Sequence, residues 1–382
     1  MDNMALTIYW INAFLIFYTY AGYSLVVLIL ARFFNHTVKK SDKYPRVTFL
    51  ITAYNEEKNI AQKLHSTLSS DYPADRLEII VASDGSIDGT DRIVKDFAER
   101  GVRLIRVEGR VGKTETQNRA VKMATGDVII FSDATTVYER DAIRKIVRNY
   151  ADPAVGAVSG RYEYYNPTNA SIGIGTILFW KYENLIKRSQ TRIKTITGCC
   201  GCIYSVRRNL YTPLPPDIIS DLVEPLKILE KGYRIVFEPE AIAHEETTEK
   251  TKEEFQMRVR VISRGMRGLL YMKILFNPLK HGFVAFQLIS HKLFRWLVPV
   301  FMILLFASNA LLIGKPFYAG TFLLQVIFYG MALAGWIGER FHWKLKLFSI
   351  PLYFFTVNIA SIISLFKTIK GYKAVTWETV RK

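Results

Sequence analysis

Four long apolar stretches without a charged residue frame a more polar middle segment. They are Asn3–Ala31 near the start of the chain and Trp296–Gly314, Pro316–Gly338 and Leu347–Phe366 near its end. A helix of roughly 20 apolar residues crosses the hydrocarbon core of a membrane, which is about 30 Å thick. Core helices of soluble proteins rarely contain runs of this length. The pattern predicts an integral membrane protein with an N-terminal anchor and three C-terminal spans.

Between these stretches, short apolar runs alternate with segments of helical periodicity. The strand-like runs are rich in β-branched residues and comprise Arg46–Ala53, Leu77–Ser83, Val102–Glu108, Asp127–Ala134, Ala154–Tyr165 and Tyr233–Ala241. The helical segments between the first four runs are Glu56–Ser69, Asp88–Arg100 and Lys113–Ala124. This alternation predicts an α/β fold with a parallel, doubly wound sheet and helices on both of its faces.

Polar side chains gather where three of the predicted strands end, in Ala53–Glu57, Ser83–Thr90 and Ser132–Thr136. The carboxyl ends of parallel strands share one edge of a sheet, so these clusters are expected to meet in one ligand-binding crevice. In this interpretation Asp84 accepts hydrogen bonds from a ligand. A purely structural role, in which Asp84 and Asp88 cap the following helix, explains Asp88 but not three clusters.

The chain is strongly basic, with 51 lysines and arginines, 34 acidic residues and a formal net charge of +17. In membrane proteins such residues concentrate in the cytosolic loops. Both flanks of the middle segment are basic, through Arg32, Lys39, Lys40, Lys43, Arg46, Lys280, Lys292 and Arg295. We therefore expect an integral membrane protein of a bacterial inner or plasma membrane, with the middle segment in the cytosol. Binding to nucleic acid would explain the charge but not the four spans.

The side of the membrane on which the C-terminal tail lies stays open. A chain that starts outside and crosses four times ends outside. The tail, however, carries five basic residues and one acidic residue: Lys367, Lys370, Lys373, Arg381, Lys382 and Glu378. This bias favours a cytosolic tail. Pro351 and Asn358 break the fourth apolar stretch, which is therefore also compatible with a re-entrant or interfacial segment.

Six segments of the middle region, in this order, resemble the membrane-embedded branch of the family 2 glycosyltransferases. They read "TAYNEE", "ASDGSIDGT", "GKTETQN", "FSDATT", "GCCGCIYSVRR" and "ISDLVEPLKILEKGYRIVFEPEAIAHEE". The family includes the synthases of cellulose, chitin, hyaluronan and poly-N-acetylglucosamine. The resemblance implies a cytosolic domain with the GT-A fold, a Rossmann-like mixed sheet that binds a nucleotide sugar, plus transmembrane helices.

The expected organisation follows from the apolar stretches and the resemblance together. Residues 1–40 hold the N-terminal transmembrane helix and residues 41–250 the GT-A domain. Residues 251–292 are expected to form basic amphipathic interfacial helices, and residues 293–370 the C-terminal transmembrane helices. Residues 371–382 are the basic tail.

For the nucleotide sugar, the resemblance implies binding residues at several positions. Ala53, Tyr54 and Glu56 match the segment that cradles the uridine, and Asp84 matches the acid that binds the uracil or ribose. Lys113 matches the lysine near the diphosphate, where a cation suits a dianion. A solvated lysine at a helix start is the alternative.

Asp133 matches the first acid of the family's D-x-D motif, which holds a divalent metal on the diphosphate. The second acid is absent, because the sequence reads Asp133-Ala134-Thr135. Mg²⁺ or Mn²⁺ needs few protein ligands when phosphate oxygens and waters complete its coordination. We therefore expect such a metal to be used, with Asp133 as its ligand.

Asp221, in "ISDLVEP", matches the family's catalytic base, although Ser220 stands where a glutamate is usual. A carboxylate there takes the proton of the acceptor hydroxyl as it attacks the anomeric carbon. The alternative is an N-cap for the helix Leu222–Lys231. Cys200 and Gly201 match an acceptor-side element of the family, without its two preceding aromatic residues.

The segment Phe255–Gly268 departs furthest from the processive members of the family. Arg258 and Arg260 fit their Q-x-x-R-W or Q-R-x-R-W motif, but Met257 and Val261 stand where glutamine and tryptophan would. Together with Arg264, these arginines are expected on the acceptor and diphosphate side. A basic helix that lies on the membrane surface is the alternative.

The sequence therefore predicts an inverting, metal-dependent membrane glycosyltransferase. It would use a UDP-sugar and extend a cell-surface polysaccharide through β-linkages. The alternative is transfer of one sugar to a polyprenyl phosphate or a lipid-linked oligosaccharide, which the missing tryptophan favours. The expected partners are the donor, a glycan or lipid-linked acceptor and membrane lipid, with no nucleic acid. The presence of Asp84, Asp133 and Asp221 argues against a non-catalytic scaffold. Trp377 is expected near the site if the tail is cytosolic.

Overall fold

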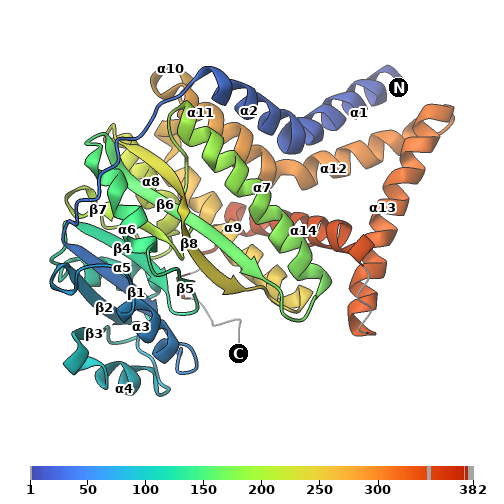
Figure 1. The fold of residues 1–382 in the computed structure, drawn as a ribbon. Coiled ribbons are helices and arrows are strands. Elements are labelled where there is room, and N and C mark those ends of the chain that lie inside the picture. The colour runs from blue at the N-terminus through green and yellow to red at the C-terminus, as the bar shows by residue number, and fades with distance from the viewer. Residues whose placement is uncertain (1, 342–345, 374, 377–382) are drawn as a thin grey trace.

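A computed structural model of the chain describes residues 2–341, 346–373, 375 and 376. Trp377 lies outside this part. The described residues contain an eight-stranded sheet in the order β3-β2-β1-β4-β7-β6-β8-β5 (Figure 1). The strands are β1 Val47–Ala53, β2 Leu77–Ser83, β3 Val102–Arg106, β4 Val128–Asp133, β5 Val137–Tyr138, β6 Val155–Tyr165, β7 Tyr204–Arg207 and β8 Arg234–Glu246.

The sheet is mixed and not wholly parallel. Strands β3, β2, β1 and β4 are parallel, as the alternation predicted, but β7 runs antiparallel between β4 and β6, and β5 pairs antiparallel with β8. The sequence pattern missed β5 and β7, because elements of two and four residues are too short to show alternation. The mixed sheet is the one that the family resemblance implied.

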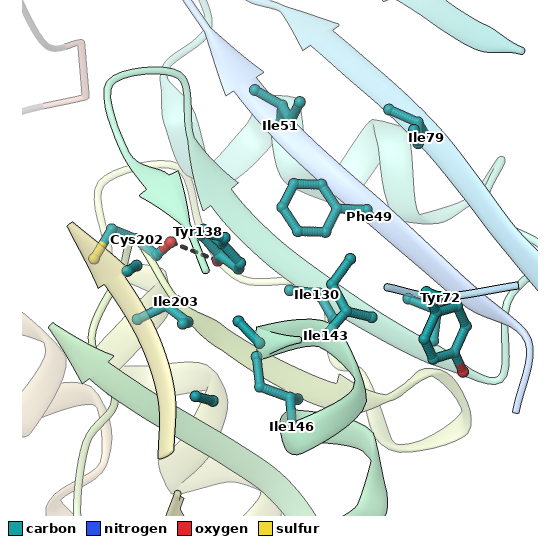
Figure 2. Close-up of a cluster of buried hydrophobic side chains, with 14 of the residues drawn as sticks. Phe49, Ile51, Tyr72, Ile79, Ile130, Tyr138, Ile143, Ile146, Cys202 and Ile203 are labelled. Atoms are coloured by element: carbon teal, nitrogen blue, oxygen red, sulfur yellow. Dashed lines mark hydrogen bonds between the residues drawn. The ribbon is translucent and has the colours of Figure 1, made fainter. Parts of the chain in front are cut away.

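Helices cover both faces of this sheet. The helices are α3 Ile60–Leu68, α4 Thr90–Lys95, α5 Lys113–Val121, α6 Ala142–Val147 and α8 Ser220–Glu230. Apolar residues of α3, α4 and α6 pack with Phe49 and Ile51 on one face. Figure 2 shows Ile143 and Ile146 of α6 in this cluster. Those of α5 and α8 pack with Leu50 on the other. Because β1 is buried on both faces, it reads as a continuous apolar run.

Long helices lie along one side of the sheet (Figure 1). They are α1 Asp2–Phe17, α2 Tyr23–Phe33, α7 Ser171–Ile193, α9 Thr251–Tyr271, α12 Phe294–Leu311, α13 Pro316–Arg340 and α14 Ser349–Ile369. The short helices α10 Pro278–His281 and α11 Phe283–Gln287 precede α12. The π-helical turns η1 Tyr18–Gly22 and η7 Leu288–Leu293 join α1 to α2 and α11 to α12.

Four of these helical stretches are long and apolar enough to cross a membrane: Asp2–Phe33, Phe283–Leu311, Pro316–Arg340 and Lys346–Ile369. The second is longer than its charge-free stretch and takes in Lys292 and Arg295. The expected break at Pro351 and Asn358 is absent, because α14 is continuous. Pro351 lies in its first turn, where a missing N–H leaves no gap in the hydrogen-bond ladder.

The last spans differ in their surroundings. α14 packs against α9 and α7 of the sheet domain, and half of its apolar window is buried, whereas α13 is almost entirely exposed. Beyond α14, Val375 returns to the sheet domain, because a Cβ added to Gly112 would overlap the Val375 carbonyl group. The described start of the tail therefore lies beside the loop that leads into α5.

Candidate active site at the strand ends

The three polar clusters do meet at one edge of the sheet. β1 is paired in parallel with β2 on one side and β4 on the other, with Ala53 opposite Ser83 and Thr52 opposite Asp133. The ends of these strands are therefore level. This register brings the residues after β1, β2 and β4 together, as the sequence predicted.

Asp84 is fully buried directly after β2, and its carboxylate holds the next loop. It accepts hydrogen bonds from the backbone N–H groups of Val111 at 2.8 Å and Gly112 at 3.0 Å. The Thr116 hydroxyl group of α5 donates a third at 3.0 Å. The alternative that Asp84 caps the helix after β2 is wrong, because these partners belong to the loop before α5 and to α5 itself.

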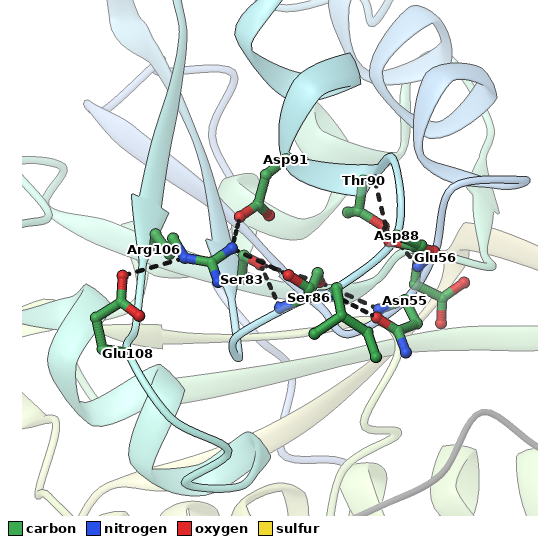
Figure 3. A network of polar contacts seen from close by, with 10 residues as sticks. Asn55, Glu56, Ser83, Ser86, Asp88, Thr90, Asp91, Arg106 and Glu108 are labelled. Carbon is green, nitrogen blue, oxygen red and sulfur yellow. Dashed lines mark hydrogen bonds and ion pairs between the residues drawn. The ribbon is translucent and has the colours of Figure 1, made fainter.

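The loops after β1 and β2 are also tied together (Figure 3). Asn55, which has a positive φ, accepts from the Ile87 N–H at 2.9 Å, and the Glu56 N–H donates to the Thr90 hydroxyl at 2.8 Å. Asp88 accepts from the Thr90 N–H at 3.0 Å, so it does hold the first turn of α4. These bonds fix the backbone at the position expected to cradle the nucleotide.

Side chains in the expected uridine segment are partly engaged within the chain. The Arg110 guanidinium group lies over the Tyr54 ring, 4.1 Å from its centre. Ala53 is buried at the end of β1. Glu56 is also buried, and burial raises the pKa of its carboxyl to about 7, helped by the negative charges of Asp133 and Glu245.

Lys113 and Asp133 form an ion pair in the crevice. Lys113 is the first residue of α5, and Asp133 is the last residue of β4. Burial disfavours the charged amine, but Asp133 outweighs it, so the pKa of Lys113 lies above its ordinary value. The alternative of a solvated lysine is therefore wrong, whereas a contact between Lys113 and a diphosphate stays a prediction.

Asp221 is close enough to Lys113, Asp133 and Arg264 for their charges to shift its pKa. Burial raises that pKa, while Lys113 and Arg264 lower it. Asp221 is the second residue of α8, and Ile219 is the N-cap, so the capping role is wrong. A Cβ added to Gly201 would lie 2.8 Å from the Asp221 Oδ2, which shows how closely the acceptor-side loop approaches the carboxylate.

The arginines Arg258 and Arg264 of α9 make their contacts within the chain. Arg264 is buried and donates to the Thr114 hydroxyl at 2.9 Å and the Ile218 carbonyl at 2.7 Å. Arg258 pairs with Glu254 at 2.7 Å and lies over the ring of Phe179. Burial lowers the pKa of Arg260, and Asp133 opposes this. Arg260 and Arg264 are therefore close to the crevice, whereas the contacts of Arg258 join α9 to α7 and α14.

Cys200 is buried in the loop before β7. The Lys187 amino group donates to the Cys200 sulfur at 3.0 Å, and the Cys199 N–H donates to the Asp221 carbonyl at 2.9 Å. The three cysteines are free thiols. This loop therefore connects the backbone of Asp221 to the buried amine of Lys187 in α7.

Two functional candidates were missed in the sequence. Lys63 of α3 is fully buried below the loop after β4 and donates to the Thr136 carbonyl at 2.8 Å. Glu245 near the end of β8 accepts a hydrogen bond from the Thr135 hydroxyl group. No local pattern reveals either one, because each meets its partner only through the tertiary fold. Among the described residues, no three acidic, histidine or cysteine side chains form a metal-binding group.

This arrangement can perform group transfer from a diphosphate donor. Lys113 supplies a cation that would suit a diphosphate, and the carboxylate of Asp133 beside it is an oxygen ligand of the kind that Mg²⁺ or Mn²⁺ prefers. Asp221, within charge range of both, supplies a carboxylate that can act as a general base. Such a division of roles is what a displacement at a sugar carbon requires.

Comparisons with known proteins agree with this geometry. The family model of glycosyl transferase family 2 matches residues 48–212. The poly-beta-1,6-N-acetyl-D-glucosamine synthase of Staphylococcus aureus is 28% identical over 235 residues, 60% of this chain and 57% of that synthase. The chain thus matches little more than half the length of that relative.

Two further proteins are similar over more of their length. The probable glycosyltransferase YdaM of Bacillus subtilis is 29% identical over 72% of this chain and 67% of its own length. The structure of the mannosyltransferase PcManGT from Pyrobaculum calidifontis, in complex with GDP-Man and Mn²⁺, has a TM-score of 0.71. It is 21% identical, covering 94% of this chain and 98% of that one, and shows the shared fold. Residues 48–212 of the chain thus match family 2 of the glycosyltransferases, and the chain has the GT-A fold together with four helices long and apolar enough to span a membrane.

Proposed function

We propose that this protein is an inverting glycosyltransferase that transfers a sugar from a UDP-sugar to a growing cell-surface polysaccharide. The observation that carries the proposal is the convergence of Lys113, Asp133 and Asp221 in one crevice, near enough for their charges to interact. The similarity to a poly-beta-1,6-N-acetyl-D-glucosamine synthase supports a polysaccharide product.

In the proposed reaction, an acceptor hydroxyl attacks the anomeric carbon of the donor in one displacement. The new carbon–oxygen bond forms as the bond to the diphosphate breaks, and Asp221 takes the hydroxyl proton. Lys113 stabilises the negative charge on the departing UDP. Because the attack comes from the opposite side, an α-linked donor gives a β-linkage.

A divalent metal fits the chemistry of the crevice. Asp133 and the hydroxyl group of Thr135 are oxygen donors of the kind that Mg²⁺ and Mn²⁺ prefer. When bound, the metal would neutralise charge on the diphosphate as the sugar leaves. In the structure, Lys113 forms an ion pair with the Asp133 carboxylate. Donor binding would draw Lys113 towards the phosphates and free Asp133.

We also propose that the GT-A domain and the C-terminal tail lie on the cytosolic side. Val375 lies against Gly112 of the GT-A domain, which requires an even number of crossings between them. α14 is the span that packs along α9 and α7, so it is assigned to the interface while α12 and α13 cross. This assignment removes the conflict with the basic tail. The domain limits of 41–250 and 251–292 remain part of this proposal.

A second candidate is single transfer to a lipid-linked phosphate, favoured by buried positive charge on the acceptor side. Lys292 lies 3.8 Å from the position of a Cβ on Gly198, in the acceptor-side loop, and Lys187 contacts that loop at Cys200. Arg295 pairs with Glu183 at 2.5 Å, while its Nε and Nη2 have no hydrogen-bond partner among the described residues. Glu183 acts on all three cations and Asp221 on Lys292, and an anionic acceptor would balance the positive charge that remains.

The test is turnover of a panel of UDP-sugars by membranes containing the protein, with Mg²⁺ or Mn²⁺ and sizing of the products. A long polymer supports the polysaccharide synthase. One added sugar, dependent on polyprenyl phosphate, supports the second candidate. Asp221→Asn is expected to abolish transfer while UDP binding stays within about twofold of the wild type. Transfer by this variant at the wild-type rate would overturn the assignment of the base.

A further inference from the structure

The loop after β4 lacks the second carboxylate of the D-x-D motif, because Thr135 takes that position. Its hydroxyl group does not point into open solvent. It donates a hydrogen bond of 2.5 Å to the Oε1 of Glu245, a residue 110 positions later in the chain. A carboxylate therefore lies next to the position where the motif would have supplied one.

The sheet register explains this placement. β5 follows the loop directly and pairs antiparallel with β8, with Val137 opposite His244 and Tyr138 opposite Ala243. One step further along the same ladder brings Thr136 opposite Glu245. Successive side chains of a strand alternate between its faces, so Glu245 and His244 point in opposite directions. His244 faces Glu139 and Glu163, whereas Glu245 faces the loop that carries Asp133.

Two further acids and the buried amine of Lys63 lie near enough to Glu245 for their charges to interact. Glu245 is buried, and both its charge and that of Asp133 act on the buried carboxyl of Glu56. Three acidic groups thus approach one another at the crevice. Lys113 compensates Asp133, but in the proposed reaction it moves to the diphosphate. Lys63 offsets part of this negative charge, and a divalent cation between Asp133 and Glu245 would offset more of it.

We propose that Glu245 supplies the second protein carboxylate of the divalent metal site, replacing the missing acid of the D-x-D motif. The inference deepens the proposed function and rests on its metal-dependent chemistry. Asp133 and Glu245 hold the metal from β4 and β8, and Thr135 orients Glu245 through its hydroxyl group. The diphosphate and water supply the remaining ligands.

The experiment measures Mn²⁺ affinity by electron paramagnetic resonance, in purified full-length protein with UDP present. Glu245→Gln is expected to weaken Mn²⁺ binding at least tenfold. Thr135→Asp in the Glu245→Gln background restores the missing acid and is expected to recover most of that loss. Thr135→Val, which keeps both carboxylates, is expected to weaken binding less than Glu245→Gln does.

Glu246→Gln is the matched control, because Glu246 is the exposed neighbour on β8 and hydrogen-bonds Tyr165 at 3.2 Å. It should bind Mn²⁺ like the wild type. The inference is overturned if Glu245→Gln retains wild-type affinity, or if Thr135→Val loses as much affinity as Glu245→Gln. Near-UV circular dichroism of each variant reports whether its fold is intact.

The metal measurement separates this inference from the proposed function. If the wild-type protein transfers sugar but Glu245→Gln binds Mn²⁺ with wild-type affinity, only the role of Glu245 is refuted. Protein that binds Mn²⁺ through Glu245 but transfers no sugar from any UDP-sugar would refute only the proposed function.

Discussion

Replacement of Asp84 tests how the nucleotide side of the crevice is held together. The sequence predicted a ligand-binding acid, whereas the carboxylate already accepts hydrogen bonds from Val111, Gly112 and Thr116. A hydrogen bond to a charged group contributes about 1.5–3 kcal/mol, and more is lost when its buried partner is left unpaired. With three such bonds at the low end of this range, Asp84→Ala should lower the free energy of unfolding by about 4.5 kcal/mol. Removal of the cost of burying the charged carboxylate would reduce this loss.

Asp84→Asn is the finer perturbation, because the side chain keeps its size. An amide oxygen in the place of Oδ1 can still accept from Val111 and Thr116. The amide nitrogen then faces the Gly112 N–H, which loses its 3.0 Å bond to Oδ2 and keeps the longer, 3.2 Å bond to the oxygen in the place of Oδ1. We expect a loss of about 2 kcal/mol, and about 1 kcal/mol for the control Thr116→Val, which removes only one neutral donor.

The assay is thermal unfolding of the detergent-solubilised protein without nucleotide, followed by calorimetric titration with UDP. At roughly 2–4 °C per kcal/mol for a domain of this size, Asp84→Ala should lower the unfolding temperature by about 10 °C or more. Its affinity for UDP should also fall, because Lys113 follows the displaced loop. Unfolding temperatures equal to the wild type in both Asp84 variants, with weakened UDP binding only, would refute the structural role.

Two buried ionisable groups predict opposite pH dependence of stability. Burial raises the pKa of Glu224 to about 8, so the folded state holds a proton that the unfolded state releases above about pH 4.5. The free energy of unfolding therefore falls by up to about 4 kcal/mol as the pH rises towards 8. Glu224→Gln should remove this dependence of the unfolding temperature on pH, measured by thermal unfolding between pH 5 and pH 9. A slope unchanged in this variant would contradict the assignment. Burial lowers the pKa of Lys63 to about 7. Below the ordinary pKa of 10.5 the unfolded state takes up a proton that the folded state does not, so the free energy of unfolding declines as the pH falls from 10.5 to 7. Lys63→Met should flatten this part of the curve and gain stability at pH 7, and equal unfolding temperatures at pH 7 would count against it.

The local sequence determined much of the fold. The runs that became β1, β2 and β4 were located to within about one residue, because buried parallel strands are continuous, β-branched and bounded by polar turns. The apolar stretches located the four candidate spans, since length and the absence of charge decide whether a helix can cross a membrane. The sequence also predicted that Asp84 and Asp133 lie at one edge of the sheet, because the carboxyl ends of parallel strands share an edge.

The tertiary structure decided what depends on contacts between distant segments. Strand β5 is too short to show a pattern, yet its pairing with β8 brings Glu245 to Thr135. The burial of Arg264 and of Lys63 follows from packing of α9 and α3, and the same residue types would suit an exposed helix face equally well. Sequence periodicity shows which side of an element is buried. It does not show which element covers it, because that depends on the register and packing of the whole chain.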